Sequence, residues 1–154
     1  MDIHLVKGSG HGPTRIAALD AALFAAGISD YNLIPLSSIL PPGSRLLSTP
    51  WRAEAKDYGN RLYLVVSTAH TPDDTTGAVA ALGWVRSSDG RGFLVEDSGG
   101  DRDTVVERVS RALEDMRQRR NLVEAESGCE VMEVKAGSPH SCALVAAVFK
   151  SAPW

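Results

Sequence analysis

The sequence predicts an α+β fold of strands and two main helices, stacked in layers. Strand-like segments outnumber helical ones, and they do not alternate regularly with helices as they would in a doubly wound sheet. The chain has 154 residues, which is long enough to bury a core, and it contains no internal repeat or low-complexity linker. We therefore expect residues 1–154 to form a single domain.

The amino-terminal part predicts a strand, a turn and a helix. Residues 3–7 have the pattern of a strand, and the glycine-rich stretch Gly8–Gly12 is expected to turn the chain. Residues 14–26 should form a helix that ends at Gly27. Alanines fill the gaps between apolar residues that recur at helical spacing, namely Ile16, Leu19 and Leu23.

Strands and one long helix are expected along the rest of the chain. The helix should cover about residues 104–122, where Thr104 and Glu107 fit a capping box and arginines fall in the last turns. The expected strands cover residues 31–36, 61–67, 78–85, 92–96, 130–135 and 142–149, with turns at 71–74, 87–90 and 137–140.

Composition and charge argue against several classes of protein. The net charge is only −3 and 23% of the residues are charged, whereas a nucleic-acid-binding protein would carry a basic surface. The apolar runs are too short for a membrane-spanning helix, and we expect no signal peptide. Cys129 and Cys142 are expected to be buried free thiols rather than metal ligands. A cytoplasmic protein fits these features best.

The most informative segment is Tyr31–Pro42, in which a hydrophobic strand ends in the pair Ser37–Ser38 before two prolines stop it. The hydroxyl of Ser38 can attack the carbonyl carbon of Ser37 and exchange the amide for an ester. Elimination would turn Ser38 into dehydroalanine, and hydrolysis would then yield a pyruvoyl group, an electrophile for covalent catalysis. Taken by itself, a Ser-Ser pair before prolines is also typical of an ordinary loop.

This segment resembles the processing site of the pyruvoyl-dependent arginine decarboxylase family, and further motifs follow in the family's order. They are Gly8–Thr14 with Ala17–Leu23 and Ala26–Ile28, then Asn32–Ile34 and Ser37–Pro42, then Gly92–Glu96, and finally Cys142–Phe149. The resemblance implies an αββα sandwich with mainly antiparallel sheets. It also implies a homotrimer whose active sites lie between neighbouring subunits.

The resemblance implies a role for five residues. Cleavage would fall between Ser37 and Ser38 and convert Ser38 to the pyruvoyl cofactor, while Asn32 would polarise the carbonyl during the acyl shift. Asp20 would bind the guanidinium of the substrate, and Glu96 would return a proton to Cα. The implied reaction joins arginine to the pyruvoyl group as a Schiff base, yields agmatine and carbon dioxide, and needs neither pyridoxal phosphate nor a metal.

The residue pattern alone leaves other interpretations open for Glu96 and Asp20. Glu96 ends an apolar run, whose burial would raise the pKa of its carboxyl to suit a proton donor, but it could equally be solvated beside Asp97. Asp20 lies among leucine and alanines and would need a partner such as a guanidinium if it were buried. On the surface of the helix it would face water.

Three features depart from the family: the segment Thr49–Asp57, Leu19 and Pro35. They leave two alternatives, the same chemistry on another amino acid, and a non-cleaved, non-catalytic relative that acts as a binding or assembly protein. A third alternative is a nucleotide site at Gly8–Gly12. Its spacing, however, is GxGxG and not the GxGxxG of dinucleotide-binding loops, and no Walker lysine follows.

Overall fold

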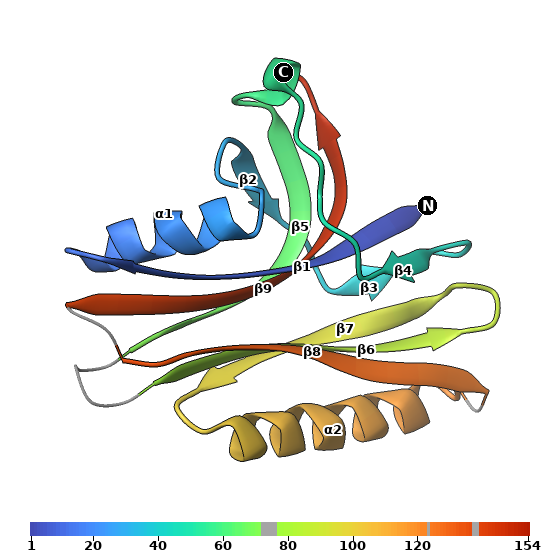
Figure 1. The fold of residues 1–154 in the computed structure, drawn as a ribbon. Helices are drawn as coiled ribbons and strands as arrows, with labels where there is room; N and C mark the ends of the chain where they lie inside the picture. The colour runs from blue at the N-terminus through green and yellow to red at the C-terminus, as the bar shows by residue number, and fades with distance from the viewer. Residues whose placement is uncertain (72–76, 123, 137–138) are drawn as a thin grey trace.

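The computed structural model is a sandwich of four layers (Figure 1). Helix α1 (Arg15–Ala25) covers the outer face of one sheet, helix α2 (Arg102–Arg119) covers the outer face of the other, and the two sheets face each other between them. The structure describes residues 1–71, 77–122, 124–136 and 139–154, so the turns expected at 71–74 and 137–140 lie largely outside the described residues. The expected α+β class and its αββα layering are confirmed.

The first sheet has the strand order β2-β5-β9-β1-β4. The central strand β9 is antiparallel to both of its long neighbours, β5 and β1, whereas the short strands at the two edges run parallel to their neighbours. The strands are β1 (Asp2–Gly12), β2 (Asn32–Pro35), β4 (Arg45–Leu47), β5 (Arg61–His70) and β9 (His140–Ala152).

The second sheet has the strand order β3-β7-β6-β8 and is antiparallel throughout. Its strands are β3 (Ile39–Leu40), β6 (Ala78–Ser87), β7 (Gly92–Gly99) and β8 (Ala125–Val134). The longest strands extend beyond the predicted ranges because turn-prone glycines and polar residues at their ends still pair with neighbours. The two-residue strand β3 and the three-residue strand β4 were not expected, since segments this short carry no periodicity.

Strand β9 shows why the core is continuous. Residues 141–149 are buried on both faces, with Val145 packed between the two sheets and Leu144 packed beneath α1. A strand covered on both faces reads as an unbroken apolar run, as this one does. Within the described residues, no helix is long and apolar enough to cross a membrane.

The glycine-rich stretch at residues 8–12 is strand and not turn, so the first prediction for it was wrong. These residues continue β1 and pair with β9. A Cβ atom placed on Gly8 would lie 2.0 Å from the backbone oxygen of Ala22, and one on Gly10 would lie 2.5 Å from the Ala22 nitrogen. The glycines therefore let α1 pack directly on the strand backbone, and the segment forms no phosphate-binding loop.

Two smaller expectations also need correction. Helix α2 begins earlier than predicted, because the carboxylate of Asp101 caps it by accepting a hydrogen bond of 2.8 Å from the Thr104 backbone N–H. Thr104 is therefore inside the helix and is not its cap. Of the two cysteines, only Cys142 is buried, and burial raises the pKa of its thiol to about 11; Cys129 is exposed.

Candidate active site

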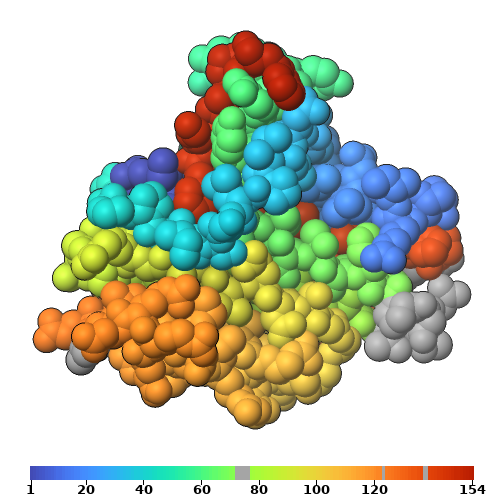
Figure 2. Space-filling model, turned by 180° about the vertical axis from the view of Figure 1, so that it is seen from behind, coloured from blue at the N-terminus to red at the C-terminus, as the bar shows by residue number. Residues whose placement is uncertain are grey.

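The pair Ser37–Ser38 lies where the chain crosses from one sheet to the other. The backbone N–H of Leu36 still donates to the Leu64 carbonyl of β5, at 2.9 Å. Two residues later, the carbonyl of Ser38 accepts from the Leu94 backbone N–H of β7, at 2.8 Å. Figure 2 shows this cyan segment between the green atoms of β5 and the yellow atoms of β7. The sheets thus hold both ends of the Ser-Ser segment.

A tight turn is centred on Ser38. The Ile39 backbone N–H donates to the carbonyl of Ser37 at 2.6 Å, and this closes a three-residue turn of the kind found at strand ends. The bond places an N–H donor on the carbonyl oxygen that would become negative if the Ser38 hydroxyl attacked it. Donors fixed in advance on a developing oxyanion are a common source of rate acceleration.

Glu96 faces the same point from β7. Side chains alternate along this strand, so Phe93 packs toward α2 while Leu94 packs between the sheets, and Glu96 follows Leu94 on the inner face. The Ser38 hydroxyl donates to the Glu96 carboxylate, with Oγ at 2.7 Å from Oε1 and 2.8 Å from Oε2. Although these residues are 58 positions apart in the sequence, the fold brings them into contact.

The Glu96 side chain is more exposed to solvent than the sequence led us to expect. The expectation of a partly buried, desolvated carboxyl is therefore wrong. Its neighbour Asp97 points to the opposite face of β7, where the hydrogen bond from the Arg108 guanidinium lowers the pKa of the Asp97 carboxyl. The two carboxylates thus face different layers of the protein.

Asn32 and Asp20 lie away from the Ser38–Glu96 pair. The side-chain amide of Asn32 donates to the Gly59 carbonyl at 2.6 Å, and Ser37 follows five positions later, after about 16 Å of extended chain. Asp20 lies on the exposed face of α1 and makes no hydrogen bond or ion pair with any described residue. The structure therefore brings together Ser37, Ser38 and Glu96 but neither Asn32 nor Asp20.

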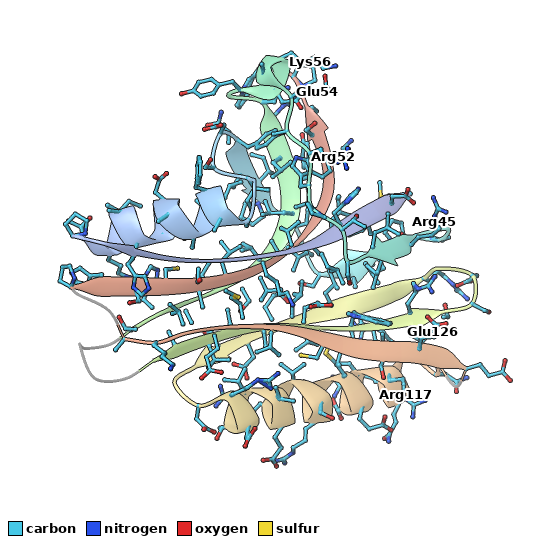
Figure 3. All side chains as sticks on the ribbon, viewed as in Figure 1. Arg45, Arg52, Glu54, Lys56, Arg117 and Glu126 are labelled. Atoms are coloured by element: carbon cyan, nitrogen blue, oxygen red, sulfur yellow. The ribbon has the colours of Figure 1, made fainter. Side chains whose placement is uncertain are left out.

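The unusual segment Thr49–Asp57 folds against the start of β2. The Trp51 indole N–H donates to the Tyr31 hydroxyl at 3.0 Å, and that hydroxyl donates to Asp57, which ends a 3₁₀ turn (Ala55–Asp57). Burial raises the pKa of Tyr31. Figure 3 shows Arg52, Glu54 and Lys56 around the end of the molecule remote from Arg117 of α2. Pro35, the other local departure, ends an edge strand, where a missing N–H is tolerated.

Sequence analysis missed the backbone groups of the site. The Ile39 and Leu94 N–H groups contact the Ser37 and Ser38 carbonyls, but any residue except proline supplies such a donor. No residue type marks them. The Leu94 donor depends on how the segment meets β7, and the Ile39 donor depends on the turn at Ser38.

Comparison with known proteins identifies the family. The family model described as pyruvoyl-dependent arginine decarboxylase matches residues 2–152. The chain belongs to this family. The pyruvoyl-dependent arginine decarboxylase of Halobacterium salinarum is 30% identical over 150 residues, which cover 96% of this chain and 92% of that protein. The same alignment length is found for a second strain of that organism.

Two other members of the decarboxylase family match over shorter segments. The pyruvoyl-dependent arginine decarboxylase of Methanothermobacter thermautotrophicus is 36% identical over 103 residues, covering 67% of this chain and 65% of that protein. That of Methanopyrus kandleri is 60% identical over 40 residues, covering 26% of this chain and 27% of that protein. This chain therefore spans less than two thirds of the length of these two relatives. The family's name implies a pyruvoyl group.

Proposed function

We propose that residues 1–154 form one decarboxylase domain that cleaves itself between Ser37 and Ser38 and then converts arginine to agmatine and carbon dioxide. The observation that carries the proposal is the 2.7 Å hydrogen bond between the Ser38 hydroxyl and Glu96. Family membership over residues 2–152 supports the same chemistry. The Ser37–Ser38 segment fits the pyruvoyl group, because it presents a carbonyl held by an N–H donor beside a hydroxyl held by a carboxylate.

The cleavage consists of an acyl shift, an elimination and a hydrolysis. The Ser38 oxygen bonds to the carbonyl carbon of Ser37, the amide C–N bond breaks, and the hydroxyl proton ends on the freed nitrogen. Elimination then removes the Cα proton of Ser38, which passes to solvent, breaks the Cβ–O bond and leaves Ser37 as a carboxylate at a new C-terminus. One water adds to the resulting enamine after tautomerisation, ammonia departs, and position 38 carries a ketone. The Ile39 N–H stabilises the negative charge on the Ser37 oxygen during the first step.

Glu96 supplies the proton that the decarboxylation needs. The pyruvoyl group would supply an electrophilic carbonyl that takes the substrate amine and, once joined to it, an electron sink for the pair left by carbon dioxide. The hydrogen bond between Glu96 and Ser38 supports this role, since a carboxyl beside position 38 is within reach of a substrate joined there. We propose that a neighbouring subunit covers this carboxyl in the assembled protein, which would exclude water from the reaction.

The two remaining residues are proposed to act across a subunit boundary. In a homotrimer, Asp20 of one chain would bind the guanidinium of arginine beside Ser38 of the next, through a bidentate pair of hydrogen bonds. Asn32 of a neighbouring chain would polarise the Ser37 carbonyl during the acyl shift. Support comes from their exposed positions, since both side chains are accessible to a neighbouring chain.

Denaturing mass spectrometry of freshly purified protein tests the proposal. We expect two fragments, residues 1–37 and residues 38–154, the second blocked at its N-terminus and lighter than a serine-ended fragment by one ammonia. Ser38→Ala, which cannot form the ester, should stay intact. Glu96→Gln in cleaved protein should lower kcat for arginine by about 100-fold, because an amide is not a proton donor. An intact wild-type chain after long incubation would contradict the proposal and favour the non-cleaved relative.

The substrate is tested separately through Asp20. If Asp20 binds a guanidinium, Asp20→Asn should lower kcat/KM for arginine by about 10- to 100-fold while cleavage continues. Unchanged turnover of arginine by this variant would remove the guanidinium assignment and leave another amino acid as the substrate.

A further inference from the structure

A buried hydroxyl lies between the sheets close to Glu96. Ser67 of β5 is only 4% exposed, and it shares a face of the strand with Val65 and Ala69, which belong to the apolar layer between the sheets. A hydroxyl in such a layer is unfavourable unless it is hydrogen-bonded. The Ser67 Oγ donates to the backbone carbonyl of Asp97, at 2.7 Å. It therefore links the two sheets one residue beyond Glu96.

The part of β7 that carries Glu96 is otherwise weakly held on one side. Strand β3 pairs only with Gly92 and Phe93, and the Ser38 carbonyl takes the N–H of Leu94. Beyond Leu94, β7 pairs with β6 alone within the described chain. An edge segment of this kind opens more readily than one paired on both sides.

Asp97 is held from the opposite face as well. The Arg108 guanidinium of α2 donates to the Asp97 carboxylate, with Nε at 2.6 Å from Oδ2, and to the Ser98 carbonyl at 3.0 Å. Ser67 acts from the inner face of β7 and Arg108 acts from its outer face. Residue 97 is thus fixed from both sides, directly after Glu96.

We propose that Ser67 is a positioning residue, which holds β7 so that the Glu96 carboxyl stays within reach of the group at position 38. The proposal rests on the proposed function, because it assigns Ser67 a role through Glu96. The hydroxyl contacts no reacting atom. The Ser67 hydrogen bond keeps the Glu96 backbone at a constant distance from the Ser37–Ser38 segment.

The kinetic test compares Ser67→Ala with Ser67→Thr and Val65→Ala in cleaved enzyme. Ser67→Ala should lower kcat about 10-fold and leave KM within about twofold, since the proton donor moves while substrate contacts remain. Ser67→Thr keeps the hydroxyl and should restore most of kcat. Val65→Ala removes buried volume from the same face of β5 without contacting Asp97, so it should lower Tm but not kcat.

A second measurement does not depend on activity. Both variants are made in the uncut Ser38→Ala background, and amide hydrogen exchange is followed in a peptide that spans residues 95–98. The exchange rate should be at least fivefold higher with Ser67→Ala than with Val65→Ala. Wild-type protein that neither cleaves nor turns over arginine would sink the proposed function, and the exchange result would still decide whether Ser67 holds β7. The positioning role fails if exchange is unchanged, or if Val65→Ala lowers kcat as much as Ser67→Ala.

Discussion

Each helix covers the outer face of one sheet, but the solvent-facing sides of the two helices differ in chemical character. On α1, Ile16 is 70% exposed and Phe24 is 75% exposed, and Asp20 lies between them at four-residue spacing. On α2 the outer face is charged and carries ion pairs within the helix, namely Glu107–Arg111, Glu114–Arg117 and Asp115–Arg119. The outer face of α2 suits water, whereas the outer face of α1 suits contact with another protein.

The inner faces of the helices differ as well. Under α1, the glycines of β1 meet helix backbone, with the Ala22 oxygen 2.0 Å from a Cβ placed on Gly8. Under α2, a Cβ placed on Gly83 would meet the Val109 side chain at 2.3 Å. A side chain can rotate away from an added methyl group, whereas a helix backbone must move as a whole. The packing of α1 on its sheet is therefore less tolerant of added volume than the packing of α2.

The largest effect should come from adding one methyl group beneath each helix. Gly8→Ala forces α1 away from β1 and should lower the free energy of unfolding by about 3 kcal/mol or more. Gly83→Ala displaces Val109 and should cost about 1 kcal/mol. Chemical unfolding of both variants measures the two losses in free energy of unfolding. Equal losses would show that the two helix–sheet contacts tolerate added volume equally.

The exposed face of α1 should matter for assembly. If it contacts a second copy, Phe24→Glu should weaken association by about 2 kcal/mol per interface, because it places a charge in an apolar contact. Arg111→Glu on α2 is the matched control and should leave the assembly unchanged. Analytical ultracentrifugation over a concentration series measures both, and a Phe24→Glu protein of wild-type size would contradict the contact.

Acid should weaken the attachment of α2 more than that of α1. The Arg108 hydrogen bond lowers the pKa of Asp97 from 3.8, so this pair stabilises the fold above that value. The contribution is lost as the pH falls below 3.8 through the folded-state pKa. Unfolding curves from neutral pH downward should show this loss, and Asp97→Asn should remove that part of the pH dependence. A parallel curve for the variant would exclude the pair as its cause.

The smallest effect is expected on the charged face of α2. The Glu107–Arg111 pair has a closest approach of 4.0 Å, with side chains 72% and 81% exposed. Arg111→Ala should therefore change the free energy of unfolding by about 0.3 kcal/mol or less. A larger change in urea unfolding would mean that this face does more than contact water.

Prediction from the sequence succeeded where the signal is local. Helical periodicity located both helices, and the apolar run at residues 142–149 located the most buried strand. It failed at Gly8–Gly12, because a glycine-rich segment predicts a turn unless a helix is known to lie against it. The short strand β3 was missed, and with it the backbone donors around Ser38.

The site divides in the same way. Ser37, Ser38 and Glu96 can be identified as candidates from the sequence, and the order of the motifs is enough to suggest their chemistry. Their contact depends on the register of β3 against β7, which joins residues 58 positions apart and has no local signature. The outward direction of Asp20 was likewise undecided by its neighbours, since alanine occurs on both faces of α1.

The sequence by itself determined the α+β class, the two helices and the residues that can carry the chemistry, because each depends on side-chain type and short-range periodicity. Only the tertiary structure decided that the glycines allow a helix to pack on β1, that the Ser38 carbonyl accepts the Leu94 N–H, and that Ser67 links the sheets beside Glu96. These depend on packing and pairing between distant segments, where the free energy belongs to contacts that no single stretch of sequence contains.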